Sequence, residues 1–415
     1  MLATRTEDGS ADGVRLEDVN LATPEAFRNG FPHAMFRVLR REAPVYRHPA
    51  SHVEPFWVVS RYKDVWDVSL DQATFSSAMR GTILKNWRED ELLMVRQQML
   101  NMDPPKHTKY RRLVNQGFSP KRVNRLEPHI REMAAKIVDA VARRGSCDFV
   151  TDVAAELPLQ VIVELMGVPL EDRHLVFQWS NRMIGFDDPD YSASEEDGKA
   201  AAMEMFMYAH ELAQRRRTEP RDDLVSVLMQ AEVEGEKLDE SQFNNFFLLL
   251  LVAGNETTRN LISGGMLALF EHPDQLARLV RDPSLMPTAV EEMLRWVSPV
   301  MYFVRTATRD VELRGQRIAE GERVTLWYGS ANRDEEVFER PDTFDVGRTP
   351  NDHLAFGIGP HFCLGANLAR LEIRVMFEEL LRRLPDIELA GPVARLRSNF
   401  IHGIKSMPVR FTPER

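Results

Sequence analysis

The stretch that decides the fold is Phe356-Gly357-Ile358-Gly359-Pro360-His361-Phe362-Cys363-Leu364-Gly365, and a helical pattern follows it over residues 366–384. Its three glycines let the backbone pass very close to a flat or bulky group. Cys363 precedes a helix N-terminus, where free N–H groups and the helix dipole favour a thiolate over a thiol. A buried cysteine in a glycine turn is the alternative, but the ordered run of residues favours an anionic sulfur that acts as a ligand.

The chain has only two cysteines, Cys147 and Cys363, and they lie far apart in the sequence. Sites built from four cysteines, such as structural zinc and iron–sulfur sites, are therefore excluded. A disulfide framework is not expected in a reducing compartment. Any cysteine chemistry must use one thiolate at a time.

The composition is that of an ordinary globular protein, large enough to bury a ligand whole. Hydrophobic residues make up 43% and charged residues 28% of the 415 residues, which excludes a disordered chain. This length exceeds what one simple core usually supports, so we expect two domains or one two-lobed fold. Because the sequence has no repeat of fixed period and no Gly/Ser-rich linker, one catalytic unit over residues 1–415 is the simplest interpretation.

Charge and hydropathy argue against two kinds of partner. The formal charge of -10 argues against nucleic acid as the main partner, because phosphate binding needs a basic face. The longest apolar run is Phe246–Gly254, less than half of the roughly 20 residues that a membrane-spanning helix needs. Residues 1–16 lack the apolar core of a secretory signal. We therefore expect no membrane span and a cytoplasmic location.

Apolar periodicity predicts a mainly α fold with small β-sheets. Helical periodicity of 3.6 residues is clearest over residues 128–142, 201–215, 239–270 and 366–384. Strand patterns are short and occur over residues 56–59 and 311–327, the second with turns at Gly315 and Gly321.

The longest predicted helix has a polar break in its middle. Asp239 and Gln242 can form a capping box at its start. Its apolar run ends in Ala253-Gly254-Asn255-Glu256-Thr257-Thr258, where Gly254 weakens the helix and a threonine hydroxyl can bond back to a carbonyl one turn earlier. A widened groove would result, although a solvated helix face is the alternative.

A third motif is Glu292-Met293-Leu294-Arg295, on a helix predicted to have Pro287 in its first turn. Glu292 and Arg295 are three residues apart, so they share a helix face and can form an ion pair. Taken alone, this pattern is common.

The stretch around Cys363 resembles the signature of the cytochrome P-450 family, which has Phe, two Gly, His or Arg, Cys and Gly at these spacings. The resemblance covers nearly the whole chain and implies the cytochrome P-450 fold, with a helix-rich lobe and a small β-rich lobe. It also implies that haem b lies between the helix over 239–270 and the cysteine stretch. Cys363 would then bind the iron, and Phe356 and Gly357 would contact the haem.

The resemblance also implies roles for two other motifs. Glu256 and Thr257 match the family's oxygen-activation pair and would relay protons to dioxygen at the haem. In the family, a Glu–Arg pair such as the one at 292 and 295 completes a triad with an arginine in a later Pro-rich segment. That segment is 338–344 here, and Thr343 stands where the arginine is usual. The third member of the triad is therefore left open.

Four residues match family positions that bind the haem propionates. The two carboxylates of haem would be costly to bury without cationic or hydrogen-bonding partners. His107 and Arg111 are one helical turn apart and could reach them from one helix face. Arg305 and His361 could supply the rest. Any one of the four, taken singly, is as well explained by a surface charge.

A local basic cluster contrasts with the acidic average of the chain. The family analogy places it on the side of the haem nearest the cysteine, where electron-transfer partners dock, and an acidic ferredoxin would suit it. A solvated helix face is the alternative. Separate donors are expected, namely a ferredoxin and a ferredoxin reductase with NAD(P)H, because no attached flavin or ferredoxin domain is evident. The basic cluster consists of Lys106, Lys109, Arg112, Lys121, Arg122 and Arg125.

Segments at the family's substrate-pocket positions are apolar, which suits a hydrocarbon skeleton, although each residue could equally be core. Residues 183–191 and 398–405 resemble the corresponding segments of bacterial sterol side-chain hydroxylases, which oxidise a terminal methyl group. Terpenoid and branched-lipid hydroxylases share parts of both segments and remain alternatives. The predicted pocket residues are Met183, Ile184, Leu249, Val252, Ala253, Val300, Val304, Phe400 and Ile401.

Two other functions are alternatives to a dioxygen-dependent monooxygenase. A haem enzyme that uses peroxide directly is one, but the intact Glu256–Thr257 pair argues against it. The other is a haem protein that only binds a gas or a small ligand, which would need neither a proton relay nor a donor-docking surface.

Overall fold

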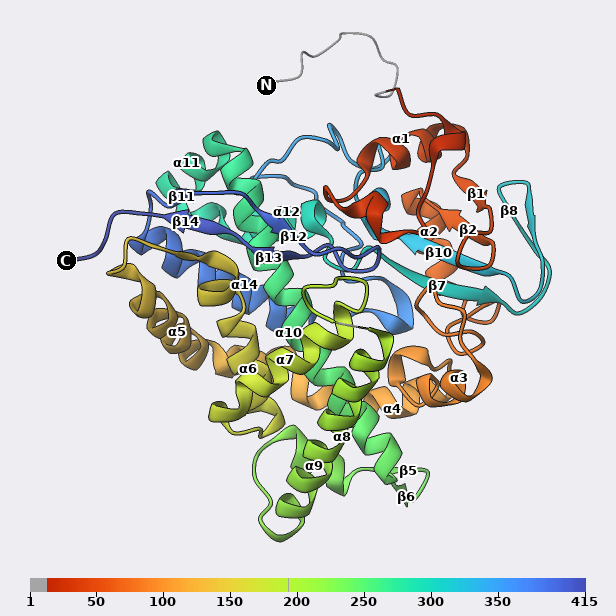
Figure 1. The fold of residues 1–415 in the computed structure, drawn as a ribbon, viewed down its shortest axis with the longest axis horizontal. Coiled ribbons are helices and arrows are strands. Elements are labelled where there is room, and N and C mark those ends of the chain that lie inside the picture. Colours follow the sequence, from red (N-terminus) through yellow and green to blue (C-terminus); the bar gives the residue numbers. More distant parts are fainter. Residues whose placement is uncertain (1–12, 193) are drawn as a thin grey trace.

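The computed structural model describes residues 13–192 and 194–415. Its helices are α1 (His33–Glu42), α2 (Tyr62–Leu70), α3 (Glu89–Val95), α4 (Lys106–Asn115), α5 (Pro120–Ala142), α6 (Glu156–Met166), α7 (Arg173–Ile184), α8 (Glu195–Thr218), α9 (Leu224–Gln230), α10 (Glu240–Glu271), α11 (Pro273–Arg281), α12 (Met286–Val297), α13 (Tyr328–Ala331) and α14 (Ala366–Arg383). The mainly α fold predicted from periodicity is confirmed (Figure 1).

The strands are short and form small sheets. They are β1 (Val45–His48), β2 (Phe56–Val59), β3 (Phe75–Ser76), β4 (Ser146–Asp148), β5 (Glu232–Val233), β6 (Glu236–Lys237), β7 (Tyr302–Ala307), β8 (Val311–Leu313), β9 (Gln316–Ile318), β10 (Arg323–Trp327), β11 (Glu388–Leu389), β12 (Ala394–Arg395), β13 (Ile404–Ser406) and β14 (Pro408–Arg410). The largest sheet has the order β1-β2-β10-β7-β3, in which β10 is parallel to β2 and antiparallel to β7.

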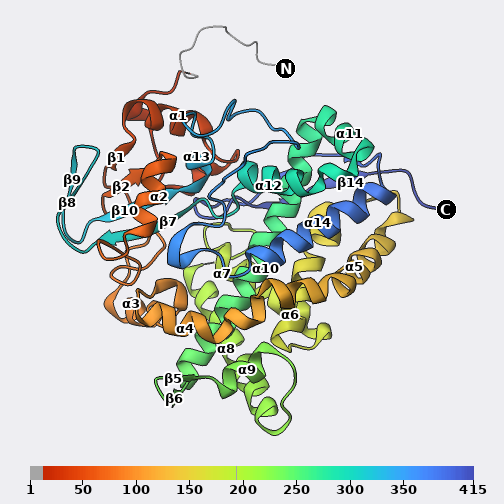
Figure 2. The same ribbon diagram turned by 180° about the vertical axis from the view of Figure 1, so that it is seen from behind.

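Helix α10 runs through the centre of the helical part, as both ribbon views show (Figures 1 and 2). The predicted capping box is confirmed, because Gln242 N–H donates to Asp239 Oδ1 at 2.8 Å and Asp239 N–H donates to Gln242 Oε1 at 3.0 Å. Helices α6, α7, α8, α12 and α14 all pack against α10. A helix covered on several sides can be apolar nearly all round, which explains the long apolar run within α10.

The five-stranded sheet lies on the other side of the molecule, together with α1 and α2 (Figures 1 and 2). The predicted strand over residues 56–59 is β2. The predicted strand region 311–327 is divided into β8, β9 and β10. Gly315 and Gly321 have φ angles of +76° and +82°, a left-handed conformation that glycine adopts without steric cost. Both predicted turns are therefore confirmed.

The predicted helix over residues 128–142 begins eight residues earlier, since α5 starts at Pro120 and Pro128 lies inside it. A proline inside a helix removes one backbone hydrogen bond, which usually ends or kinks the helix. Here the helix continues because α5 packs along α14 and against α6, and that burial offsets the lost bond. Within the described ranges, no helix is both long and apolar enough to cross a membrane.

A buried ion-pair triad joins α12 to the segment that follows α13. Arg295 Nε lies 2.7 Å from Glu292 Oε2, and both side chains are fully buried, which confirms the predicted pair. Arg348 Nε lies 3.1 Å from the same carboxylate oxygen. Thr343 contributes only its backbone carbonyl, which accepts from Arg295 and Arg348. The triad is therefore complete, and its third arginine stands five residues after the position expected from the family pattern.

We predict that Glu292→Gln destabilises the fold strongly. The change leaves the Arg295 guanidinium without its carboxylate, and breaking a buried pair by removing one partner typically costs about 3–5 kcal/mol. Urea-induced unfolding of the haem-loaded protein measures the difference. Glu339→Gln is the control, because its side chain is 91% exposed beside Arg340. Equal unfolding midpoints for the two variants would contradict a structural role for the triad.

Candidate active site

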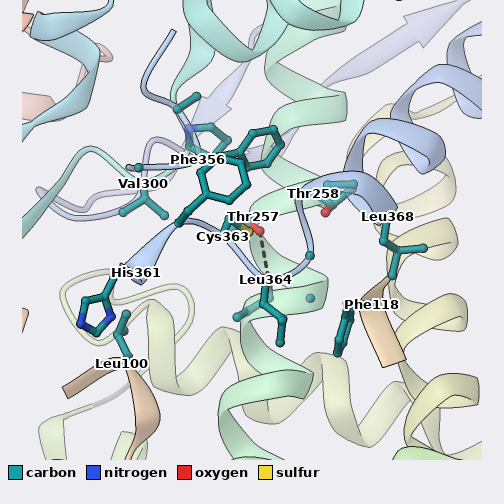
Figure 3. Close-up of a pocket in the computed structure, with 18 of the residues that line it drawn as sticks. Leu100, Phe118, Thr257, Thr258, Val300, Phe356, His361, Cys363, Leu364 and Leu368 are labelled. Atoms are coloured by element: carbon teal, nitrogen blue, oxygen red, sulfur yellow. Dashed lines mark hydrogen bonds between the residues drawn. The ribbon is translucent and has the colours of Figure 1, made fainter. Parts of the chain in front are cut away.

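A cavity lies between α10, α4, β7 and the stretch 356–365, and Cys363 lines it (Figure 3). It contains about 1500 Å³ of empty space, part of it open to solvent. Pockets of about 300–1,000 Å³ already hold a drug-sized ligand, so this cavity has room for a cofactor together with a substrate. All seven predicted cofactor-binding residues line it, namely His107, Arg111, Arg305, Phe356, Gly357, His361 and Cys363.

The backbone around Cys363 is fixed by short-range hydrogen bonds. Cys363 N–H donates to the Phe356 carbonyl at 2.9 Å and so closes the loop. Gly357 and Gly359 have φ angles of +67° and +74°. A Cβ atom added at Gly359 would also lie 3.1 Å from the Ser69 carbonyl oxygen. The two glycines are therefore required by backbone conformation, and the second also by close contact with α2.

The Cys363 side chain is partly accessible because it faces the cavity. Burial raises the pKa of its thiol, whereas the Gly365 backbone N–H and the charges of Arg111 and Arg370 lower it. A coordinated metal cation deprotonates a thiol outright, so these groups would help to hold a thiolate that binds iron. Cys147 lies in β4 and away from the cavity. Burial raises the pKa of its thiol to about 12, which makes it inert.

The cationic side chains on the cavity wall lack an anionic partner among the described residues. Arg305 is 3% exposed, and its Nε has no acceptor, although its Nη1 donates to the Val304 carbonyl at 2.9 Å. His107 Nδ1 is also buried without a partner. A buried guanidinium without a counter-charge is costly. Two carboxylates placed here would satisfy these groups, so the residues present fit the propionates of the haem that the resemblance implies.

The lowered pKa values of His107 and His361 also fit a site for the haem propionates. The rings of His107 and His361 lie 4.0 Å apart between centroids. Burial, followed by the charge of Arg111, lowers the pKa of His107 to about 4. Burial and the nearby Arg305 hold the pKa of His361 well below its usual range. Both imidazoles are thus neutral near pH 7 and can act as hydrogen-bond donors beside a region of positive charge.

One face of α10 forms the opposite wall of the cavity. Thr257 Oγ1 donates to the Ala253 carbonyl at 2.8 Å (Figure 3), which confirms the predicted bond to the preceding turn. A Cβ atom added at Gly254 would lie 2.8 Å from the Ile162 side chain, so glycine permits the close packing of α6 on α10. The cavity-facing stripe of α10 consists of Leu249, Leu250, Ala253, Gly254, Thr257, Thr258 and Leu261.

Glu256 lies outside this stripe and does not line the cavity. Its carboxylate forms a buried ion pair with Arg259, and Arg259 Nη1 donates to Asn181 Oδ1 of α7 at 2.8 Å. Burial raises the pKa of Glu256, and the Arg259 charge opposes that shift. Of the predicted proton-relay pair, the structure therefore places Thr257 at the cavity and Glu256 outside its lining, linked to α7 through Arg259.

Three of the nine predicted pocket residues line the cavity: Leu249, Ala253 and Val300. The other six do not line the cavity, and their positions in the fold explain why. Val304 is fully buried because alternation along β7 places Phe303 and Arg305 on the cavity face and Val304 on the other. Val252 lies on the face of α10 that also carries Glu256. Phe400 and Ile401 are buried in a core cluster that includes Val304, and Met183 and Ile184 pack against core clusters from the end of α7.

Several cavity residues were absent from the sequence prediction. Phe303 alternates with Val304, so the period of two in the strand could have indicated it. Tyr328 and Glu372 line the cavity from α13 and α14. Glu372 is 2% exposed, its Oε2 has no partner among the described residues, and burial raises its pKa well above the usual range. No sequence signal distinguishes either residue from core.

The family model "Cytochrome P450" matches residues 20–385. The steroid C26-monooxygenase of Rhodococcus jostii is 43% identical and covers 95% of this chain and 85% of its own length. The methyl-branched lipid omega-hydroxylase of Mycobacterium tuberculosis is 43% identical and covers 99% of each chain. A solved cytochrome P450 of Mycobacterium marinum in complex with pseudoionone is 40% identical, with a TM-score of 0.89 over 97% of this chain and 100% of its own.

We predict that only one of the two cysteines is needed for thiolate ligation of iron. The reduced carbon monoxide complex of the wild-type protein should show the long-wavelength Soret band of a thiolate-ligated haem, and Cys363→His should lose this band. Cys147→Ser should keep it, because the Cys147 side chain does not reach the cavity. A wild-type spectrum like that of a histidine-ligated globin would refute the assignment.

Proposed function

The chain belongs to the cytochrome P450 family, and from that premise we propose that it hydroxylates a terminal methyl group on a steroid side chain with electrons from a ferredoxin. It is a haem-dependent monooxygenase, an oxidoreductase whose cofactor is haem b. The single observation that carries the proposal is the cavity itself, because Cys363 and an apolar wall face the same space.

The reaction consumes one dioxygen, two electrons and two protons for each substrate. One oxygen atom is inserted into a C–H bond of the substrate to form an alcohol, and the other leaves as water. Haem supplies the dioxygen chemistry when it is bound through the Cys363 thiolate, which donates electron density towards O–O cleavage. The chain must therefore hold the haem, orient the C–H bond, exclude bulk water and deliver protons.

Binding and orientation fall to two groups of side chains. Arg305, Arg111, His107 and His361 line the cavity and would hold the propionates, and Arg305 Nε and His107 Nδ1 are unpaired among the described residues. Leu249, Ala253, Val300 and Phe303 present hydrocarbon to the remaining space, which disfavours a charged group there. An aliphatic chain end fits this wall. Thr257 is one of two threonines on the stripe of α10, and we assign its hydroxyl to proton delivery.

The identity of the substrate rests on the relatives. The names of the two curated relatives, steroid C26-monooxygenase and methyl-branched lipid omega-hydroxylase, both designate oxidation at the end of a hydrocarbon chain. Both relatives are 43% identical to this chain, so a methyl-branched lipid is the second candidate substrate. Smaller terpenoids are a third, because a solved neighbour was crystallised with pseudoionone.

A binding and product assay distinguishes these substrates. Cholest-4-en-3-one, a methyl-branched fatty acid and a monoterpene are each titrated into the haem-loaded protein, and the spectral shift of water displacement is recorded. We expect the steroid to bind at micromolar concentration and to give a side-chain alcohol on turnover. No shift with the steroid, together with tight binding of either other compound, would transfer the assignment to that compound.

We predict that Thr257→Ala uncouples electron consumption from hydroxylation. The change removes the hydroxyl that lines the cavity but leaves the apolar wall intact, so haem and substrate binding should be nearly unchanged. Hydrogen peroxide formed per NADH should rise severalfold at the expense of product, with Thr257→Ser as the control that keeps the hydroxyl. Unchanged coupling in Thr257→Ala would remove this role from the residue. Glu256→Gln should mainly slow turnover, because Glu256 does not itself line the cavity.

The basic cluster is the proposed docking surface for the ferredoxin. Arg111 of α4 donates to the Pro360 carbonyl at 3.1 Å, so α4 lies directly against the loop that carries Cys363. Lys109 is paired with Glu234, and Arg122 with Asp222. The remaining four side chains are exposed and form no ion pair with the described residues, and they are Lys106, Arg112, Lys121 and Arg125.

We predict that reduction by the ferredoxin slows after charge reversal of Arg112 and Lys121, which are free of ion pairs in the described part of the chain. It should also slow as salt rises, because the screening length shortens to about 8 Å near 0.15 M. Arg281→Glu is the control, since α11 lies far from α4 (Figure 1). Stopped-flow reduction measures both effects. A rate that ignores salt and both reversals would disprove docking at this surface.

A further inference from the structure

A second cavity, referred to below as the polar cavity, shares no lining residue with the cavity at Cys363. It contains about 1020 Å³ of empty space, part of it open to solvent. Its walls come from the loop at residues 29–31, from α1, from the end of α10, from α12 and from the β12–β13 hairpin. Figure 1 shows α12 and this hairpin beside the upper part of α10. The monooxygenase activity leaves the polar cavity without a role.

The charged residues of the polar cavity are mostly basic. Three arginines line it, Arg37, Arg333 and Arg395, together with three histidines, His33, His272 and His402. Two carboxylates oppose them, Glu271 and Asp342. Among the described lining residues, three arginines and two carboxylates give a formal charge of +1 with the histidines neutral.

The carboxylate of Asp342 is already shared between two guanidinium groups. Its Oδ1 accepts from Arg333 Nη1 at 3.0 Å, and its Oδ2 accepts from Arg37 Nη2 at 3.0 Å. Glu271 is exposed at the end of α10. Burial lowers the pKa of Arg395, and the charge of Glu271 opposes this shift without a hydrogen bond to Arg395 in the described part of the chain. The acidic residues therefore do not satisfy all the donors of this cavity.

Three donors remain without an acceptor among residues 13–192 and 194–415. Arg333 is 5% exposed, and its Nε has no acceptor, although its guanidinium lies 3.6 Å from the centre of the Trp296 ring. Arg395 forms no hydrogen bond or ion pair there, and its guanidinium lies against Gly30, where an added Cβ would approach Cζ to 3.4 Å. His33 Nδ1 is buried without a partner. Arg333 Nε and His33 Nδ1 are buried, and buried donors left unpaired cost free energy that an added acceptor recovers. Arg395 is only partly buried.

Burial and the nearby arginines both lower the pKa values of two histidines in the polar cavity. Burial, followed by the charge of Arg333, holds the pKa of His33 well below its usual range. Burial lowers the pKa of His402 to about 4, and the nearby Arg395 and Arg333 contribute. His402 Nδ1 bonds to the Val297 carbonyl at 2.7 Å. Neutral imidazoles therefore stand beside arginines that favour an anion.

We propose that the polar cavity binds a small oxyanion, held by Arg333 and Arg395 with His33 as a third donor. Guanidinium groups present planar N–H pairs that match the oxygens of phosphate and carboxylate groups. The unpaired Nε of Arg333 and the unpaired guanidinium of Arg395 would each gain a charge-assisted hydrogen bond. Inorganic phosphate and a dicarboxylate share this chemistry, and they are the two candidate ligands. The site lies outside the monooxygenase cavity and does not depend on the proposed substrate.

Isothermal titration calorimetry on the haem-loaded full chain tests the proposal, with inorganic phosphate in one arm and succinate in the other. Potassium chloride at matched ionic strength controls for screening. We expect saturable binding of one ion per chain in at least one arm. Saturation by phosphate alone or by succinate alone identifies the ligand class, and saturation by both supports an oxyanion site of broad specificity.

Arg395→Gln should weaken this binding at least tenfold. Arg397→Gln is the matched control, because Arg397 is an exposed arginine two residues further on that pairs with Glu25 at 3.6 Å and does not line the polar cavity. The reduced carbon monoxide spectrum shows that each variant retains its fold around the haem. If Arg395→Gln does not fold, His33→Gln replaces it, because His33 Nδ1 has no bond to lose.

The proposal is overturned if neither ion binds in a saturable way. It is equally overturned if Arg395→Gln binds as tightly as the wild type, or if potassium chloride reproduces the heats. None of these results bears on the monooxygenase activity, which the substrate assay tests separately.

Discussion

The hydrogen bond from Cys363 N–H to the Phe356 carbonyl is the contact on which the rest of the site depends. It closes a loop whose shape requires left-handed backbone at Gly357 and Gly359, and it sets Cys363 directly before α14. The sulfur then faces the stripe of α10 across the cavity. A change in this loop would move the cofactor relative to every side chain that must contact it.

The charged sites of the described chain are of two kinds. A complete site is one whose charged groups are paired with each other, and an incomplete site is one with donors that have no acceptor among the described residues. The Glu292 triad is complete, since Arg295 and Arg348 share one buried carboxylate, and it serves the fold. The arginine and histidines beside Cys363 are incomplete, because Arg305 and His107 keep unpaired nitrogens. The propionates of the haem that this family binds would pair with those nitrogens. The polar cavity also has donors without an acceptor among the described residues, and an oxyanion would supply one.

Helix α10 links these regions because its length brings different residues to different neighbours. Its middle presents Ala253 and Thr257 to the cavity at Cys363, while Glu256, on the adjacent face, is tied to α7 through Arg259. Its final turns reach the polar cavity with Gly264, Leu267, Ala268 and Glu271. One helix thus serves both cavities. The periodicity of about 3.6 residues per turn is what separates these roles along and around it.

Features that depend on near neighbours could be predicted from the sequence alone. The glycine turns around Cys363, the capping box at Asp239, the bond from Thr257 to the preceding turn and strand β2 all follow from spacings of a few residues, which covalent geometry and hydrogen bonding fix locally. The family pattern also named seven residues as cofactor-binding, and all seven line one cavity. Only the tertiary structure decided that Arg348 completes the triad and that Val304 turns away from the cavity. The tertiary structure also decided that Lys109 pairs with Glu234 and that His33 and Arg395 line the same cavity. These contacts join segments that are distant in the chain or depend on which face of an element is covered, and packing decides both.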